Sequence, residues 1–225
     1  MSLRIEPARA DDAAAIAQVH VASWRQAYDG LIPAAHLAAL SVERRTAMWQ
    51  AALAAGHPVV RVGRDARGVD GAPDVVGFVA YGRSRDPDAP PGGAEVWSLY
   101  LDPSAWSQGI GRALWTAARD DLAASACRDV SLWAIDGNRR AIRFYEAAGF
   151  VAEPTSARRF ELGGATLTER RYRWRAPGIA LATDGEAGTP SGLPRPATEP
   201  TLPVRRSQNP SPSPDPNPNP IGASA

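Results

Sequence analysis

The chain has 225 residues, 44% of them hydrophobic, and a formal net charge of +1. This length suits one ordinary domain with an appendage, and the small net charge gives no reason to expect nucleic acid or an acidic membrane as a partner. The single cysteine, Cys127, excludes an internal disulfide and a cysteine-based metal cluster. No apolar stretch reaches the ~20 residues that span a bilayer, and the N-terminus lacks the apolar segment of a signal peptide. We therefore expect a soluble, cytoplasmic protein.

The composition changes near Ala176. Twelve of the 21 prolines fall between 176 and 225, and that stretch has no aromatic residue. Proline fixes φ and removes a backbone donor, so such a stretch cannot form a strand ladder or a helix. We expect a folded domain over 1–175 and a disordered proline-rich tail over 176–225. The alternative for the tail is a proline-rich ligand for a partner protein.

Strand-like and helix-like patterns alternate from residue 3 to residue 175. In chain order the sequence predicts a strand at 3–8, a helix at 10–28, a short helix after Pro33, a helix at 41–56, strands at 58–65, 74–83 and 94–102, a helix at 110–125, a strand at 129–135, a helix at 138–149, and closing strands at 158–164 and 168–175. Ser41 and Gly56 are typical of the two ends of a helix. Antiparallel-looking strands at both ends, with helices interleaved between them, predict a mixed α/β sheet.

A glycine turn, SQGIGRALW at 107–115, stands between the strand at 94–102 and the following helix. Gly109 and Gly111 let backbone N–H groups approach a ligand without obstruction by a Cβ. The first N–H groups of a helix lack intrahelical partners and carry positive partial charge, which suits a phosphate or pyrophosphate, and Arg112 adds its charge there. A dinucleotide-binding fingerprint would require glycine or alanine at Leu114, and a Walker loop would require lysine, which the chain lacks. A plain tight connection is the alternative.

A second stretch, NRRAIRFYEAAGF at 138–150, follows the strand at 129–135. Together the two stretches resemble the GCN5-related N-acetyltransferase (GNAT) family. There a strand, a Q/R-x-x-G-x-G/A turn and a helix hold the pyrophosphate of acetyl-CoA, and a helix of N-x-x-A-x-x-F-Y-x-x-x-G-F type closes the other side of the cofactor. The matching positions of this second pattern are Asn138, Ala141, Phe144, Tyr145, Gly149 and Phe150. The resemblance covers 1–175 and implies a mixed, largely antiparallel sheet, flanked by helices, with a parallel central strand pair splayed around the cofactor.

The resemblance also assigns residues to acetyl-CoA, with no metal. Backbone N–H groups from Gln108 to Arg112 would bind the phosphates, the strand backbone at 99–101 would hold the pantetheine arm in the gap of the splayed pair, and the Asn138 amide would add a hydrogen bond beside its role as a helix cap. The residues so assigned are Leu99, Tyr100, Leu101, Ser107, Gln108, Gly109, Ile110, Gly111, Arg112 and Asn138. One position departs from the pattern: Trp106 replaces the leading Gln or Arg, and packs either beside the cofactor or in the core. Ser107 follows it, where glycine is frequent.

Two residues carry the chemistry expected of acetyl transfer. The phenol of Tyr145, with an ordinary pKa near 10, can protonate a departing thiolate whose acid has a pKa near 8.5. In the family this tyrosine points toward the sulfur; the structural alternative is that it anchors its helix in the core. Glu95 begins the strand at 94–102, and strict alternation places it on one face with Trp97 and Leu99. Its carboxylate could take the ammonium proton through water, more readily if burial raised its pKa above about 4.3; a solvated glutamate is the alternative.

The acceptor is an amine that the sequence does not identify. The expected function is transfer of the acetyl group of acetyl-CoA to a primary amine of a small molecule, a peptide or a protein, by a monomer or a homodimer. The alternative is a GNAT-fold module that binds acyl-CoA without turnover. In the family the first helix and the loop after it cover the acceptor site, so Trp24, Arg25 and Tyr28 are candidates there, although aromatic residues at helical spacing more often belong to a core. The three histidines lack metal-ligand spacing.

Overall fold

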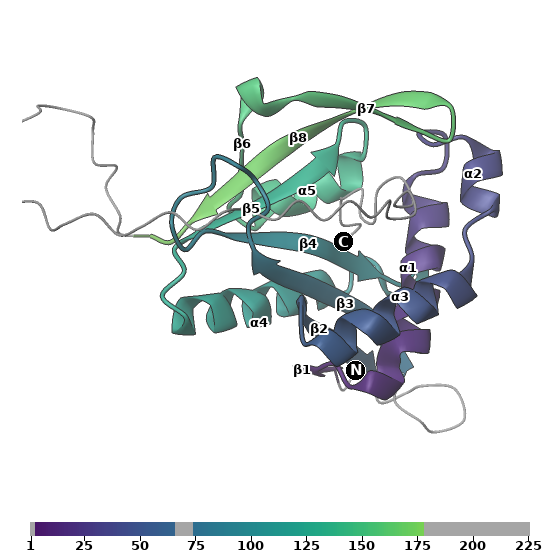
Figure 1. Cartoon of the computed structure of the whole chain (residues 1–225), viewed down its shortest axis with the longest axis horizontal. Helices are drawn as coiled ribbons and strands as arrows, with labels where there is room; N and C mark the ends of the chain where they lie inside the picture. The colour runs from purple at the N-terminus through teal and green to yellow at the C-terminus, as the bar shows by residue number, and fades with distance from the viewer. Residues whose placement is uncertain (1–2, 66–73, 178–225) are drawn as a thin grey trace, which may run out of the picture. The chain divides into compact units, whose positions relative to one another are not determined.

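The computed structural model describes residues 3–65 and 74–177, and Figure 1 shows how its elements are arranged. The strands are β1 (Leu3–Pro7), β2 (Val59–Asp65), β3 (Asp74–Arg83), β4 (Ala94–Leu101), β5 (Asp129–Ile135), β6 (Val151–Ala152), β7 (Arg158–Leu162) and β8 (Ala165–Arg175). The helices are α1 (Ala13–Ala27), α2 (Ala34–Ala38), α3 (Val42–Ala55), α4 (Ile110–Ala124) and α5 (Arg139–Ala147). No helix of the described residues is long and apolar enough to cross a membrane. The tail expected over 176–225 lies outside the described residues, except for Ala176 and Pro177.

The strands form one sheet in the order β1-β2-β3-β4-β5-β8-β6, with β7 also paired to β8. Neighbouring strands run antiparallel, except that β4 and β5 are parallel. Parallel neighbours need a crossover connection, and α4 provides it. The mixed, largely antiparallel sheet with a parallel central pair is confirmed.

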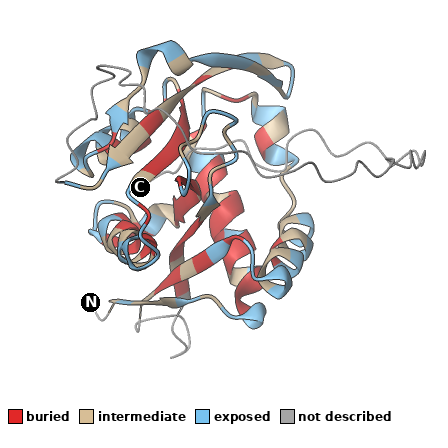
Figure 2. Ribbon diagram, turned by 60° about the vertical axis from the view of Figure 1, so that its left-hand side comes forward, coloured by how far each residue is buried: buried red, intermediate tan, exposed pale blue. Residues whose placement is uncertain are grey.

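Helices cover both faces of the sheet, and each face has its own hydrophobic core. On one face α4 packs against β2, β3 and β4, and its predicted apolar side joins Leu99 and Leu101 in what we call the α4 core. On the other face α1 packs against β3, β4 and α3, and Phe78 and Tyr100 belong to this α1 core. Figure 2 shows the buried residues concentrated on the central strands and on the inner sides of the helices.

The parallel pair β4 and β5 separates along its length. Ala94 and Glu95 are the residues of β4 that pair with β5, and β4 then continues to Leu101. The two strands therefore open a gap toward their C-terminal ends. This gap is the splay that the sequence predicts.

The predicted helices and strands are all present, with boundaries that differ by up to three residues. The predicted caps of α3 are confirmed: Ser41 Oγ accepts a hydrogen bond from the Arg44 N–H at 3.1 Å, and Gly56 has a φ of +66°. The two-residue strand β6 was not predicted. It is defined by its pairing with Tyr172 and Arg173 of β8, so no local pattern of the sequence marks it.

Candidate active site

The glycine turn forms the start of α4, as the sequence predicts. Gly109 is the N-cap and has a φ of +81°, a left-handed conformation that glycine adopts without steric cost. A Cβ at this position would meet no atom within 4 Å, so conformation rather than space explains the glycine. Ser107 also has a positive φ, of +61°, at the position where glycine is frequent in the pattern. The turn leaves the first N–H groups of α4 at the positive end of the helix without intrahelical partners.

A groove of about 310 Å³ lies at this turn, and we call it the glycine groove. It is lined by Leu101, Ser107, Gly109, Ile110, Gly111, Arg112, Arg140, Arg143 and Phe144. The first six were assigned to the cofactor from the sequence, and Phe144 belongs to the family pattern of the helix that closes the other side of the cofactor. Arg140 and Arg143, from α5, were missed. Arg140 and Arg143 are three positions apart and therefore lie on one side of α5. The sequence signal for Arg140 and Arg143 is this spacing of three residues, just after the Asn138 cap.

Positive charge dominates the glycine groove. Arg112 and Arg143 are exposed, and neither has a carboxylate partner among residues 3–65 and 74–177. Arg140 Nη1 donates to Ser107 Oγ at 3.2 Å. Guanidinium groups beside a helix N-terminus favour an anion with several oxygen atoms. The groove therefore has the donors and the charge that a pyrophosphate requires.

Trp106, the departure from the family pattern, packs against the core on one side and under Arg140 on the other. It packs partly buried against the α4 core, and the Arg140 guanidinium lies 4.5 Å from the centroid of its ring. Its Nε1–H donates to the Leu101 carbonyl oxygen at 3.2 Å. Of the two placements that the sequence left open, the structure shows the packing against the core.

The backbone of β4 is free along the gap. The Asp102 N–H donates to the Val76 carbonyl at 2.9 Å, so by alternation the peptide groups of Tyr100 also face β3, and those of Leu99 and Leu101 face β5. Because β5 does not pair with β4 at this level, the peptide groups of Leu99 and the N–H of Leu101 are open to an extended ligand, whereas the Leu101 carbonyl accepts from Trp106 Nε1. This is the strand edge to which the resemblance assigns the pantetheine arm.

Four of the assigned side chains lie outside the glycine groove. Leu99 and Tyr100 are buried in the α4 and α1 cores respectively, and burial raises the pKa of Tyr100 to about 12. Gln108 Nε2 donates to the Ser104 carbonyl at 2.8 Å on the surface. Asn138 caps α5, because its Oδ1 accepts a backbone N–H of the first turn at 3.2 Å. Its side chain is also a hydrogen-bond partner of the buried Tyr28 phenol, an interaction that acts to lower the pKa of Tyr28.

A second hollow, of about 400 Å³, adjoins the glycine groove at Arg140, and we call it the loop hollow. It lies between the end of α1 with the loop after it and the start of α5, and Asn138 lines it. The loop after the first helix therefore borders the candidate site. The aromatic side chains of that helix do not: Trp24 and Tyr28 are 1% and 0% exposed and belong to the α1 core. Arg25 donates to carbonyls of 37, 38 and 40 and so joins α1 to α2.

Tyr145 is buried in the α4 core, where its ring centroid lies 5.8 Å from that of Phe150. Burial raises the pKa of Tyr28 well above its ordinary value, and the neighbouring phenols of Tyr100 and Tyr145 act in the same direction. Tyr28 and Tyr100 belong to the α1 core, on the opposite face of the sheet. The Tyr145 phenol in the α4 core therefore lies within electrostatic range of the Tyr28 phenol in the α1 core.

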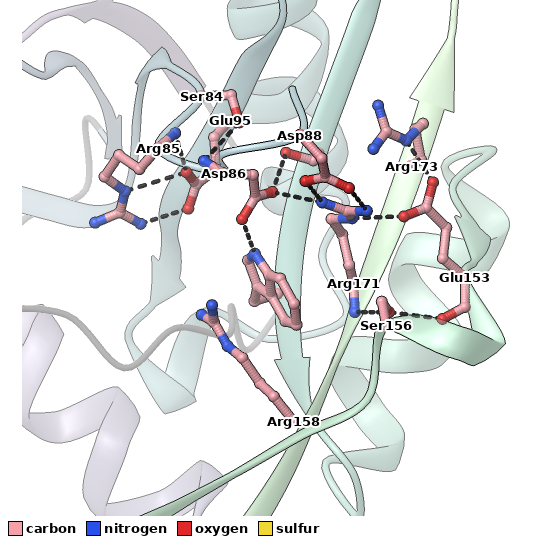
Figure 3. A network of polar contacts seen from close by, with 12 residues as sticks. Ser84, Arg85, Asp86, Asp88, Glu95, Glu153, Ser156, Arg158, Arg171 and Arg173 are labelled. Atoms are coloured by element: carbon pink, nitrogen blue, oxygen red, sulfur yellow. Dashed lines mark hydrogen bonds and ion pairs between the residues drawn. The ribbon is translucent and has the colours of Figure 1, made fainter. Parts of the chain in front are cut away.

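Glu95 is buried, at 2% exposure, rather than solvated. Its Oε2 accepts from the backbone N–H of Arg85 at 3.0 Å and from Arg85 Nε at 3.1 Å, and its Oε1 accepts from Arg85 Nη2. Figure 3 shows this pair at one end of a polar network. A carboxylate has about four acceptor positions. One position on Oε1 therefore remains for a water molecule or an ammonium group.

The structure corrects part of the predicted surroundings of Glu95. Glu95 pairs with Gly82, and a Cβ on Gly82 would lie 3.5 Å from the Trp97 ring, so Glu95 and Trp97 do share a face. Leu99 lies on the opposite face, in the α4 core. The reason is a β-bulge: Val96 and Ser98 pair with consecutive residues of β3, which leaves Trp97 as an inserted residue and shifts the alternation.

A second buried carboxylate, Glu169 of β8, was missed from the sequence. It is 2% exposed, its Oε1 accepts from Arg158 Nε at 2.5 Å, and its Oε2 has no hydrogen-bond partner among the described residues. Burial raises the pKa of Glu169, and the charge of Glu95 acts in the same direction. We call the sheet face that carries Glu95, Trp133 and Glu169 the carboxylate face. Because Arg158 comes from another strand, no local pattern distinguished Glu169 from an exposed hairpin residue.

The histidines lie apart from one another. His20 is buried, its Nδ1 accepts from Trp49 Nε1 at 3.3 Å, and burial lowers its pKa well below the ordinary value. His57 packs edge-on to Trp97, with ring centroids 5.3 Å apart. Among the described residues there is no group of three or more histidine, cysteine or acidic side chains arranged to bind a metal ion.

Comparison with known proteins shows a family match, a related sequence and two similar folds. The model of the Acetyltransferase (GNAT) family matches residues 23–150. The uncharacterized N-acetyltransferase YuaI of Bacillus subtilis (strain 168) is 30% identical over 170 residues, which cover 76% of this chain and 91% of that protein. The fold is similar to that of YncA from Salmonella typhimurium with its cofactor acetyl-CoA (TM-score 0.59, 19% identity, 82% of this chain and 100% of that chain). It is also similar to the PaiA N-acetyltransferase of Thermoplasma acidophilum in complex with coenzyme A (TM-score 0.56, 19% identity, 76% and 100%).

Proposed function

Since this chain belongs to the GNAT acetyltransferase family and is an acetyl-CoA-dependent N-acetyltransferase, we propose that it acetylates a primary amine of a small molecule or a peptide. One observation carries the proposal: a positively charged groove at a helix N-terminus is continuous, through Leu101, with a free strand edge beside a gap in the sheet. The groove suits phosphates, and the edge suits an extended arm that ends in a thioester.

The residues of the glycine groove fit the phosphates of acetyl-CoA. The N–H groups of 108–112 would bind the pyrophosphate, and Arg112 and Arg143, which have no carboxylate partner among the described residues, would add charge. The peptide groups of Leu99 and Leu101 would hold the arm as an additional strand would. The Asn138 side chain, a hydrogen-bond partner of the Tyr28 phenol, lines the loop hollow next to the groove. Its amide would add a hydrogen bond to the arm.

The chemistry follows from the groups around the gap. Acetyl-CoA supplies an activated acetyl group when it is bound. Glu95 accepts the ammonium proton of the acceptor, directly or through water, at the free position on Oε1. The backbone N–H near Leu99 stabilises negative charge that develops on the thioester oxygen. Tyr145, whose phenol is protonated at neutral pH, donates a proton to the departing thiolate.

The direct test is release of the coenzyme A thiol from acetyl-CoA in the presence of a panel of primary amines. We expect thiol release above background with at least one amine, together with the acetylated amine in the mass spectrum. Acetyl-CoA binding without thiol release from any amine would favour the alternative, a module that binds acyl-CoA without turnover.

A further inference from the structure

Arg158, at the start of β7, is held rigidly and yet keeps most of its hydrogen-bonding capacity. Its Nε donates to the buried Glu169 at 2.5 Å. The guanidinium carbon lies 3.6 Å from the centroid of the Trp133 ring. Among the described residues its Nη1 and Nη2 make no hydrogen bond, and its side chain is 49% exposed. The planar fork of the guanidinium is therefore oriented and open on its outer edge.

The platform beneath Arg158 is itself fixed by a further set of ion pairs. Trp133 Nε1 donates to Asp86 Oδ1 at 3.0 Å, and Asp86 Oδ2 lies 3.3 Å from Arg171 Nη1. Figure 3 shows this chain of contacts between strands and the loop before β4. A stacked guanidinium loses little further freedom when it binds a planar ligand.

The other arginines of the network are differently used. Arg171 and Arg173 are 11% and 9% exposed, and both form ion pairs with Glu153 and with other carboxylates, Asp88 in the case of Arg171. Arg85 is 40% exposed and gives three donors to Glu95. In Figure 3 the guanidinium groups of Arg85 and Arg158 lie on the same side of the network, away from Arg171 and Arg173. The charges of both act on Glu169.

The order of charges decides which ligand this surface suits. The glutamates are the buried ends of the two pairs, each with a side chain 3% exposed, and the arginines are the exposed ends. An approaching ligand therefore meets guanidinium edges before it meets carboxylates. Two N–H groups in a fixed fork match the two oxygens of a carboxylate.

We propose that Arg158, aided by the positive charge of Arg85, binds a carboxylate of the acceptor, so that the acceptors are amino acids and related amines that carry a carboxylate close to the amine. This inference rests on the proposed function and names its substrate class. Because Arg158 acts in binding, it affects which amine is acetylated rather than the transfer step.

The experiment compares matched pairs of acceptors with the full chain and saturating acetyl-CoA: glycine with glycinamide, β-alanine with β-alaninamide, and L-methionine with L-methioninamide. We expect kcat/KM to favour the acid of at least one pair by about tenfold or more, the range for losing a charged hydrogen bond. The ammonium group of an amino-acid amide has a lower pKa than that of the amino acid, so a larger fraction of the amide is present as the reactive neutral amine. Intrinsic reactivity therefore favours the amide and acts against this result. In Arg158→Gln the preference should fall to about one, through a rise in KM for the acid with kcat little changed.

Three further variants separate binding from folding. Arg158→Gln/Glu169→Gln removes both members of the ion pair, so no buried charge is left unpaired, and it should lose the preference as Arg158→Gln does. Arg158→Lys keeps the positive charge but lacks the planar guanidinium, so it should recover part of the preference for the acid. Arg119→Gln is the matched control, because Arg119 is 41% exposed and pairs with the exposed Asp120 on α4; it should keep the full preference.

The outcomes also separate this inference from the proposed function. Thiol release in which the amides react as well as the acids, or an acid preference that survives in both Arg158→Gln variants, overturns the inference and leaves the function standing. If no amine releases thiol, the proposed function fails, and calorimetry of the same pairs with CoA-loaded protein decides the inference. The inference is supported if an acid binds and its amide does not, and if Arg158→Gln no longer binds the acid. It is overturned if no acid binds.

Discussion

In the glycine groove, Arg112 and Arg143 have no carboxylate partner among the described residues, whereas on the carboxylate face each buried glutamate is held by an arginine. The groove thus has positive charge that no carboxylate of the described residues neutralises. The carboxylate face is already close to neutral and is ordered by its own ion pairs. The first arrangement provides affinity for a polyanion, and the second provides fixed positions for small groups.

This difference predicts how each region responds to substitution. In the groove the pyrophosphate is bound largely by backbone N–H groups of one turn, which a side-chain substitution does not remove. A substitution there must therefore add bulk or negative charge to have a large effect on binding. On the carboxylate face side chains bind the ligand and transfer the proton, so replacing a single side-chain atom is enough to have a large effect. Tyr145 is linked to both sides of the sheet, because it lies in the α4 core and its phenol acts on the pKa of Tyr28 in the α1 core.

The largest effect is expected for Tyr145→Phe, which keeps the ring and removes the proton donor. The rate of thiol release should fall by about 10²-fold, the middle of the range for general acid–base groups, with acetyl-CoA affinity little changed. Steady-state kinetics with calorimetry measures both. Tyr172→Phe is the control, because its ring lies 6.3 Å from that of Tyr145 in the same core. An undiminished rate in Tyr145→Phe would mean that water protonates the thiolate.

The next effect concerns the groove alone. Gly111→Asp places bulk and a negative charge at the buried second residue of α4, so acetyl-CoA affinity should fall at least about tenfold by calorimetry. Ala123→Asp adds the same charge at the other end of the helix and should bind normally. If Gly111→Asp folds and binds acetyl-CoA as the wild type does, the phosphates are held elsewhere.

Glu95→Gln tests the base on the carboxylate face. The loss of rate should reach roughly tenfold near pH 6, where the amine is protonated, and shrink to within about twofold near pH 9, where the amine loses its proton unaided. A pH profile of kcat/KM for both proteins measures this. A loss that is the same at every pH assigns Glu95 a positioning role instead.

A smaller effect is expected for Trp106→Phe, which keeps an aromatic ring under Arg140 and frees the Leu101 carbonyl from the indole N–H. If the arm of acetyl-CoA bonds this carbonyl, affinity should rise by about two- to tenfold, the value of one hydrogen bond. Trp174→Phe, a partly buried tryptophan of the same core, serves as the control. Weaker binding in Trp106→Phe would show that the indole itself contacts the ligand.

The smallest effect is on stability. Burial raises the pKa of Glu169 above the ordinary 4.5, so the folded chain holds this proton to higher pH than the unfolded chain does. Its contribution to stability is therefore complete below about pH 4.5 and is lost as the pH rises through the folded pKa. Glu169→Gln lacks this dependence. The free energy of unfolding of the variant, measured in urea, should rise relative to wild type between about pH 4 and about pH 8; a constant or falling difference contradicts the assignment.

The two regions also differ in how far the sequence predicts them. The glycine turn and the Asn138 cap follow from residues that are close in sequence, and both are present in the structure. The gap beside β4 was expected only from the resemblance to the family. Arg140 and Arg143 were detectable by helical spacing. Glu169 and Arg158 were not, because their pairing joins neighbouring strands. The face of Leu99 was predicted wrongly because one inserted residue, Trp97, reverses the alternation, and no local signal marks that bulge.

A crystal structure of the chain with acetyl-CoA tests the central claim most directly. We predict the pyrophosphate on the N–H groups of 108–112 with Arg112 or Arg143 against it, the arm along Leu99 and Leu101, and the Tyr145 hydroxyl within hydrogen-bond reach of the sulfur. Acetyl-CoA bound away from the glycine groove, or a sulfur remote from the gap between β4 and β5, would contradict the account.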